Sequence, residues 1–195
     1  MAQEPGRFDR AATVRAMSDL IRALGLDPAR EPELAATPER VADLYAEVLA
    51  GVDPAAAPKP VTFPAPAGGP ADLVTIRDLP FHSLCVHHFV PFFGRAHVAY
   101  LPGGRLMGIS GFARLLEHHA HRPQLQERLT SELADDLERH LAPRGLAVVL
   151  EARHLCMEMR GVRKTGVVET HVLRGALAEP SWAVRLPLPH GGPAV

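Results

Sequence analysis

The sequence predicts an α+β protein with one core, and three observations lead to this class. Apolar residues recur at helical spacing in two segments before residue 52. Short β-rich or alternating runs follow after residue 73, and such runs are typical of strands. Between two of these runs, a leucine recurs every four residues from Leu125 to Leu141, which indicates a further helix. A chain of 195 residues is long enough for one sizeable core and short for two domains.

Residues 1–52 are predicted to form a pair of helices. The first helix carries apolar residues at near-helical spacing, and Gly25 follows it as a stop signal. In the second helix, Thr37 is expected to be the N-cap, with Pro38 at the first helical position. The residues expected to form its buried face are Val41, Leu44, Tyr45, Val48 and Leu49.

Residues 53–72 are predicted to be a connection without regular structure. Six prolines lie between Pro54 and Pro70, together with two adjacent glycines. This composition cannot sustain a helix or a central strand, so a loop is expected. We do not interpret it as a boundary between independent domains, because only a helical pair precedes it.

Residues 73–175 are expected to form the main domain. Short β-rich runs predict strands at residues 73–76 and 96–101, and a final strand at residues 166–173. The remaining residues, 176–195, are rich in proline and glycine and are predicted to be an irregular tail.

Two helices are predicted within this domain, before its last two strands. Ser110 lies where an N-cap is expected, directly before an apolar periodic segment. Pro123 is expected to open the second helix, whose leucines recur every four residues. Core packing explains this leucine stripe more simply than a recognition surface does.

One further strand is predicted from Leu146 to Arg160. Because successive side chains of a strand alternate between faces, His154, Cys156 and Arg160 are expected on the same side. At strand spacing, Arg160 would lie about 13 Å from Cys156. That distance suits a ligand with reactive chemistry at one end and an anionic group at the other. Further positive charge is expected nearby from Arg163, Lys164 and Arg174.

Charge and hydropathy exclude several classes of protein. With 21 basic and 22 acidic side chains, the net charge is −1, which argues against a bulk nucleic-acid binder. No apolar run reaches the about 18 residues of a membrane-spanning helix. The first residues lack a basic segment followed by an apolar one, so no secretion signal is expected. Two cysteines without such a signal favour a reducing cytoplasm.

The two cysteines each lie within two residues of a histidine, in Cys85-Val86-His87-His88 and His154-Leu155-Cys156. Thiolate and imidazole are ligands that Zn²⁺ prefers, and three protein ligands leave one position for a catalytic water. The sequence therefore favours a metal site with histidines beside it. The alternatives are a disulfide between the cysteines or two unrelated buried thiols. Histidines outside these clusters are expected to be surface or packing residues.

Taken together, these motifs resemble the GTP cyclohydrolase I family. The resemblance extends from about Ala12 to Gly175 and is densest in the second half of the chain. It rests on five blocks, which are residues 37–42, 85–90, 108–110, 122–130 and 154–163.

The resemblance implies a tunnelling fold, which is an antiparallel four-stranded sheet with two helices on one face, preceded by an N-terminal helical pair. It also implies a toroidal homo-oligomer, commonly a decamer, with active sites at subunit interfaces. The order of strands and helices predicted above agrees with this fold.

The resemblance also implies roles at the metal site. The residues that would hold Zn²⁺ are Cys85, His88 and Cys156. A water made acidic by the ion would attack C8 of guanine. His87 and His154 match catalytic histidines that move protons, a task for which the near-neutral pKa of imidazole is suited. Ser110 matches a residue involved in the sugar rearrangement.

Other residues match the family's substrate contacts. Glu127, with Gln126 beside it, matches the acceptor for the N–H edge of guanine. Three arginines match the triphosphate clamp, in which guanidinium groups make bidentate contacts; they are Arg40, Arg114 and Arg160. Judged from their own segments alone, Glu127 and Arg40 would be solvated helix residues.

The implied activity is zinc-dependent hydrolysis of GTP to formate and 7,8-dihydroneopterin triphosphate. Two positions depart from the family pattern, since Val86 replaces an acidic residue and Gly111 replaces a lysine that would contact triphosphate. One alternative is therefore a diverged paralogue that acts on another purine nucleotide or stops at the formamide intermediate. Another is a non-catalytic protein that binds zinc and purines. A nitrile-reducing relative is disfavoured because it would need a free nucleophilic cysteine.

Overall fold

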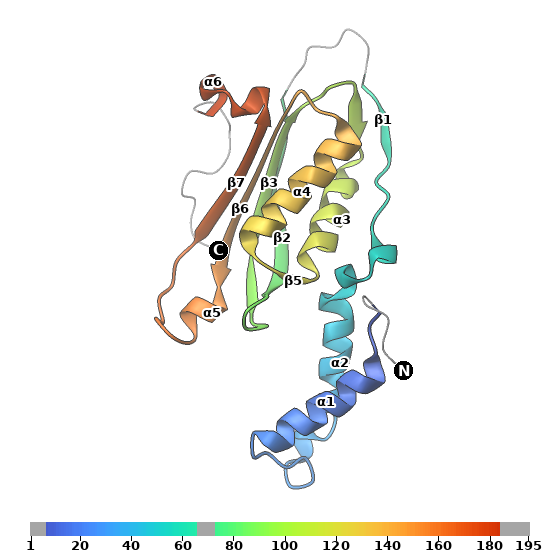
Figure 1. The fold of residues 1–195 in the computed structure, drawn as a ribbon, viewed down its shortest axis with the longest axis vertical. Coiled ribbons are helices and arrows are strands. Elements are labelled where there is room, and N and C mark those ends of the chain that lie inside the picture. Colours follow the sequence, from blue (N-terminus) through green and yellow to red (C-terminus); the bar gives the residue numbers. More distant parts are fainter. Residues whose placement is uncertain (1–6, 66–72, 184–195) are drawn as a thin grey trace.

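The protein has an α+β fold, as predicted, with one main sheet (Figure 1). The computed structural model describes residues 7–65 and 73–183. The strand order of this sheet is β5-β2-β3-β6-β7. Its strands are β2 (Val74–Cys85), β3 (Pro91–Leu101), β5 (Pro123–Gln124), β6 (Gly145–His154) and β7 (Val168–Gly175). The four longer strands run antiparallel to their neighbours, whereas β5 pairs parallel with β2.

Strand β2 is longer than the predicted segment of residues 73–76, because it continues to Cys85. Its register with β3 shifts between Ile76 and Leu79, and Asp78 in this bulge has a φ of 60°. The bulge interrupts the alternation of side chains, so the sequence pattern ends too early. Pro80 is compatible with β2 because, among the described strands, β5 pairs only with the last two residues of β2. Pro80 therefore has a paired strand on one side only, as a residue of an edge strand does.

Helices α3 (Ile109–Ala120) and α4 (Gln126–Leu141) cover one face of the sheet (Figure 1). Between sheet and helices lies the core. The stripe of α4 is part of it, which confirms core packing, because four leucines are at most 1% exposed: Leu129, Leu133, Leu137 and Leu141. The fifth predicted member, Leu125, precedes the helix and is 37% exposed.

Two predicted N-caps are each displaced from the observed cap. The N-cap is the residue whose carbonyl accepts the first helical hydrogen bond. Ala36, not Thr37, takes this position in α2, because the Arg40 N–H donates to the Ala36 carbonyl at 3.1 Å. Gly108, not Ser110, is the N-cap of α3. A short strand ends directly before Gly108, so the chain turns there whatever the side-chain preference of Ser110.

Pro123 does not open a helix, contrary to the prediction. It lies in β5, where it pairs with Leu84 of β2, and α4 begins after the extended residue Leu125. Proline is compatible with this position because β5 is the edge strand of the sheet.

The N-terminal helices α1 (Arg10–Ala23) and α2 (Thr37–Val48) pack on each other and extend from one end of the molecule (Figure 1). The predicted stop of the first helix is confirmed, since Gly25 follows it with a φ of +82°. The predicted buried face of α2 is covered only in part, and Leu44 is 51% exposed. The reason is that the pair extends away from the sheet and has little besides itself to pack against.

The predicted connection contains short regular elements. A strand, β1 (Thr62–Pro64), pairs with β4 (Arg105–Met107) in a separate two-stranded sheet. Each strand of such a sheet is an edge strand, which can contain a proline. Short 3₁₀ helices occur at Pro32–Leu34, Ala50–Val52, Pro54–Ala56 and Ala176–Ala178, and a last α-helical turn, α6, at Pro180–Ala183. The predictions for Gly68, Gly69 and the end of the tail lie outside the described residues. Within the described ranges, no helix is both long and apolar enough to span a membrane.

Candidate metal centre and catalytic site

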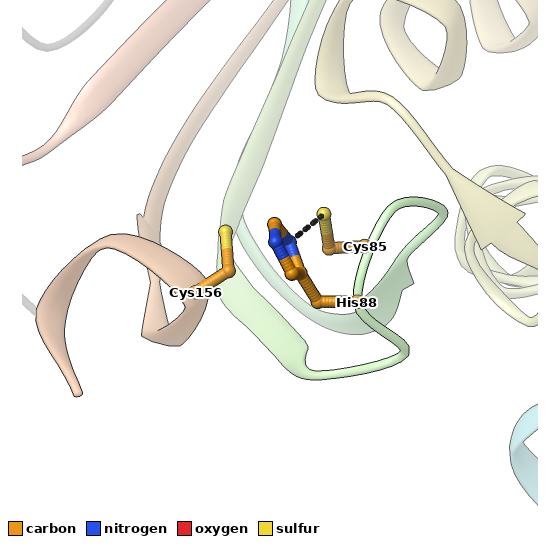
Figure 2. A group of neighbouring side chains, drawn as sticks. All are labelled: Cys85, His88 and Cys156. Carbon is orange, nitrogen blue, oxygen red and sulfur yellow. Dashed lines mark hydrogen bonds between the residues drawn. The ribbon is translucent and has the colours of Figure 1, made fainter. Parts of the chain in front are cut away.

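A tight turn between β2 and β3 carries the first Cys/His cluster. Cys85 ends β2 and is 6% exposed, and its carbonyl accepts a hydrogen bond from the Phe89 N–H at 2.8 Å. The turn directs the His88 ring back toward the thiol, so the Cys85 Sγ lies 4.0 Å from His88 Nδ1 (Figure 2). His87 is exposed, and its Nδ1 lies 3.8 Å from the same sulfur.

The second cluster does not lie on a long strand, contrary to the prediction. Strand β6 ends at His154, and the chain turns directly into the short helix α5 (Leu155–Glu158), which contains Cys156. The alternation of residue types continues to Arg160 in the sequence, but the backbone does not follow it, because the Met159 N–H closes a helical turn onto the Leu155 carbonyl. Figure 1 places α5 and the β2–β3 turn at the same end of the sheet.

Cys85, His88 and Cys156 therefore meet, although they come from distant segments (Figure 2). One ligand atom from each residue lies within 4.8 Å of the other two, and no other such group of three occurs in residues 7–65 and 73–183. Both cysteines are free thiols, which speaks against the disulfide alternative. Two thiols and an imidazole are a donor set suited to a thiophilic divalent ion.

The electrostatics of the thiols agree with such an ion. Burial, together with the neighbouring Cys85 thiol, raises the pKa of Cys156. Without a metal ion, two neighbouring thiolates repel each other, and a divalent cation between them removes this electrostatic repulsion.

Arg160 lies beside the cluster, not at a distance from it. Its Nη1 is 2.5 Å from His88 Nε2, so the predicted separation of the arginine from the metal site along a strand is wrong. Arg174, predicted to add positive charge nearby, instead forms ion pairs with Asp135 and Glu138 of α4. These pairs hold β7 against α4, and the charge of Arg174 is compensated there by the two carboxylates.

His154 borders the metal group from the end of β6. Its ring stacks on Phe92, with centroids 4.7 Å apart and an angle of 4° between the planes. Its Nε2 lies 2.7 Å from Gln126 Oε1. Burial lowers the pKa of His154, and the carboxylates of Glu127 and Glu158 oppose this shift only in part. Burial therefore favours the neutral form of the imidazole, and stacking on Phe92 fixes the plane of the ring.

Gln126 and Glu127 are adjacent in sequence but lie in different environments. Glu127 is exposed in the first turn of α4, close enough to His154 for its charge to act there. Gln126 is 2% exposed, and its amide nitrogen donates to the carbonyls of Leu150 and Val168. The family resemblance groups both residues with the substrate, whereas of the two only Glu127 is exposed.

Three predicted site residues are not brought to this cluster within one chain. The C-terminal end of α3 lies near the cluster, because the Ala120 carbonyl accepts a hydrogen bond at 2.7 Å from the hydroxyl of Ser83, two residues before Cys85. Ser110 lies ten residues earlier on that helix, roughly 15 Å away along its axis. Arg114 lines a separate cavity of about 250 Å³ with His118. The third residue, Arg40, is exposed on α2, in the helical pair that extends away from the sheet (Figure 1).

The sequence patterns assign no role to Phe92 or to the ion pair of Arg153 with Glu158. Phe92 lies directly opposite His154 in the pairing of β3 with β6, so a correct strand alignment would have found it. The ion pair links β6 to α5 and needs the helical turn that the alternating pattern conceals.

Fold and site together define a protein with a candidate metal centre and a stacked, partly buried histidine beside it. A family model described as GTP cyclohydrolase I matches residues 13–185. The chain belongs to the GTP cyclohydrolase I family.

Several curated relatives carry the name GTP cyclohydrolase 1. The one from Halalkalibacterium halodurans is 46% identical over 91% of this chain and 94% of its own. The one from Bacillus subtilis is 46% identical over 87% of this chain and 88% of its own. The one from Corynebacterium glutamicum is 48% identical over 84% of this chain and 83% of its own. A crystal structure of an archaeosine synthase QueF-Like in the apo form has a TM-score of 0.43 at 18% identity, over 53% of this chain and 94% of that one, which is too low to bear on function.

Proposed function

We propose that the protein is a zinc-dependent GTP cyclohydrolase I. It would open the imidazole ring of GTP at C8 and give formate and 7,8-dihydroneopterin triphosphate. The observation that carries this proposal is the meeting of Cys85, His88 and Cys156, with His154 two residues before Cys156. Membership of the family and relatives of that name at 46–48% identity support it.

The proposed zinc ligands are Cys85, His88 and Cys156. Their donor atoms lie within the reach of one ion, and two thiolates with one imidazole suit zinc well. When bound, the ion supplies Lewis acidity, which makes water a stronger acid and a better nucleophile near neutral pH.

The remaining roles belong to the chain's own side chains. His154, stacked on Phe92, and the exposed His87 would move protons to and from the substrate. The Glu127 carboxylate offers an acceptor for the N–H edge of guanine. Arg160, beside the cluster, provides a guanidinium group for phosphate oxygens.

A complete site would need a second copy of the chain. Ser110, Arg114 and Arg40 match substrate-handling positions but lie away from the cluster of their own chain, so a neighbouring subunit would supply them. Large apolar side chains are exposed around the metal cluster, with Phe89 at 49%, Met159 at 63% and Val162 at 68%, and such a surface favours association. We therefore propose a toroidal homo-oligomer of tunnelling-fold subunits, a decamer as the family resemblance implies, that works in the cytoplasm without nucleic-acid or membrane partners.

The test is incubation of purified, zinc-loaded protein with GTP. Formate release and the fluorescence of the oxidised pterin product are followed, with Cys156→Ala as the matched control. Formate and pterin that both disappear in Cys156→Ala, together with bound zinc, are the expected result. Formate without pterin would mean that ring opening occurs but the later rearrangement does not. If zinc is bound and no formate forms, the proposal is wrong.

A further inference from the structure

The contact between His154 and Gln126 determines which nitrogen of the histidine carries the proton. The two side chains meet at 2.7 Å, between His154 Nε2 and Gln126 Oε1. Either of two arrangements is chemically possible for such a contact, because a histidine has two tautomers and an amide can be turned by 180°. The surroundings of Gln126 decide between them.

The amide of Gln126 has one allowed orientation. On one side its nitrogen lies 3.0 Å from the Leu150 carbonyl oxygen and 2.9 Å from the Val168 carbonyl oxygen. Both backbone atoms only accept hydrogen bonds. A turned amide would place its own oxygen against these two oxygens, inside a site where Gln126 is 2% exposed. Buried acceptors left without donors are costly, so the nitrogen faces β6 and β7 and the oxygen faces His154.

Because the Gln126 oxygen can only accept, His154 must donate from Nε2 in either protonation state. In the neutral form, which carries one N–H, Nδ1 then holds the lone pair. Among the described residues, no hydrogen bond reaches His154 Nδ1, and that atom is not one of the buried nitrogens without a partner. The lone pair is therefore accessible. Stacking on Phe92 fixes the plane in which it points.

We propose that Gln126 is a positioning residue that holds His154 as the Nε2–H tautomer, so that His154 enters the reaction as a proton acceptor at Nδ1. The catalytic part of this inference rests on the proposed function. His154 would take a proton at Nδ1 from a substrate O–H or N–H group and become an imidazolium. Its Nε2–H would keep the bond to Gln126, now charge-assisted and stronger. The same proton would return to the substrate later, so no proton is gained or lost.

This assignment separates the two catalytic histidines. His87 is exposed, and its one described polar contact is with the Cys85 sulfur, at 3.8 Å from Nδ1. Among the described residues, no carbonyl or amide oxygen contacts its ring nitrogens to fix the tautomer. His87 is thus free to begin as either donor or acceptor, whereas His154 is prepared only for acceptance.

The direct test is the ring ¹⁵N NMR spectrum of zinc-loaded protein labelled at histidine. The His154 signals are identified by their loss in His154→Phe. We expect Nε2 to carry the proton and Nδ1 to be unprotonated. A proton on Nδ1 would overturn the inference. This readout needs no substrate, so it can fail or succeed independently of the proposed GTP hydrolysis.

A pair of variants tests the catalytic consequence. Gln126→Met removes the acceptor for Nε2–H while keeping the side-chain length. Thr170→Val is the matched control, because Thr170 accepts from the Gln126 nitrogen at 3.1 Å and bonds to Thr130, but does not touch His154. We expect Gln126→Met to slow single-turnover formate release about 100-fold, to leave KM within about threefold, and to show both His154 tautomers by NMR.

The control should keep its rate within about threefold of the wild type, even though both variants lower Tm by loosening the same buried network. Equal losses of rate in the two variants would mean that Gln126 acts only through stability, and would overturn the inference. A rise in KM alone for Gln126→Met would assign Gln126 to substrate contact instead. If Gln126→Met does not fold, the wild-type NMR spectrum still decides.

Discussion

Arg153 and Glu158 form a bidentate ion pair across the point where β6 becomes α5, with contacts of 2.9 and 2.6 Å. Cys156 lies between them in the sequence. The Glu158 side chain is 9% exposed, and the Arg153 guanidinium also lies over the Phe93 ring, 5.9 Å from its centroid. The hydrogen bond from Arg153 lowers the pKa of Glu158. The pair therefore ties the helical turn that carries Cys156 to the sheet.

If this pair positions Cys156, its loss should weaken metal binding. We expect Glu158→Gln to lower the affinity for Zn²⁺ about tenfold, because a ligand that is held less firmly loses more entropy on binding. The measurement is competition with a chromophoric chelator at pH 7. Glu47→Gln, an exposed change on α2, is the control and should leave the affinity unchanged. Equal Zn²⁺ affinities of Glu158→Gln and Glu47→Gln would show that the ion pair does not position Cys156.

Much of the fold could be predicted because its signals are local. The leucine stripe of α4 and the Gly25 stop depend only on neighbouring residues, and both are confirmed. The errors arise where pairing overrides the local pattern. Residues after Ile76 lose their alternation at a bulge, so the pattern predicts only the start of β2. Beyond His154 the alternation persists in the sequence, yet the chain coils into a helical turn.

The site was predictable in its chemistry but not in its geometry. Cys85 and Cys156 could be grouped because each lies near a histidine and the chain has no other cysteine. The burial of Gln126 is different, since it arises only when the start of α4 lies over β6 and β7. No local pattern distinguishes Gln126 from its exposed neighbour Glu127.

A second pair, His119 and Asp136, joins α3 to α4 with a contact of 2.7 Å. Burial alone would raise the pKa of Asp136, but the hydrogen bond and charge of His119, with the charge of Arg139, lower it overall. A carboxyl whose pKa is lowered in the folded state stabilises the fold above its unfolded pKa. That contribution is lost as the pH falls through the lowered folded value.

We expect Asp136→Asn to cost about 1–2 kcal/mol of unfolding free energy at pH 7, since it weakens a largely buried hydrogen bond. The difference from the wild type should shrink as the pH falls below the ordinary carboxyl pKa of about 3.9. Urea unfolding across this range measures it. Asp135→Asn, whose carboxyl is 54% exposed beside Arg174, is the control and should cost less. A difference that persists undiminished at pH 3 would exclude the pair as its cause.

On the other face of the sheet, Glu151 lies directly opposite Glu169 in the pairing of β6 with β7. Burial raises the pKa of Glu151, and the hydrogen bond and charge of Glu169 raise it further. Raising the pKa of an acid in the folded state favours its protonated form. The ionised pair therefore destabilises the fold as the pH rises above the ordinary glutamate value.

Removing one of these charges should stabilise the protein at high pH. We expect Glu151→Gln to raise the free energy of unfolding by about 0.5 kcal/mol at pH 8, because like charges directly opposite on a sheet repel. The gain should decrease as the pH is lowered to 5. Urea titrations at both values measure it, with Glu47→Gln as the control. A loss of stability at pH 8 would show that the Glu151 carboxylate has a favourable partner that outweighs the repulsion.

Gly111, which replaces the lysine of the family pattern, lies in the first turn of α3 without space for a side chain. A Cβ built there would be 2.7 Å from both Cγ and Sδ of Met107 and 3.1 Å from Cβ of Pro60. Met107 is 4% exposed, so its side chain cannot simply move into solvent. We expect Gly111→Ala to cost about 1–3 kcal/mol of stability from overpacking. Urea unfolding measures it, and Met107→Ala should relieve part of the cost in the double variant.

Gly111→Lys then separates this steric cost from the effect of the missing charge, with Gly111→Ala as its matched control. A lysine that reaches a phosphate adds a charge-assisted contact of about 1.5–3 kcal/mol. If Gly111 marks a paralogue with weakened GTP binding, KM for GTP should fall about tenfold or more between the alanine and lysine variants, a change of about 1.4 kcal/mol per factor of ten. Steady-state formate release at matched zinc content measures KM. An unchanged KM would mean that the charge is supplied elsewhere in the site or is not needed, which favours ordinary GTP hydrolysis over the paralogue alternative.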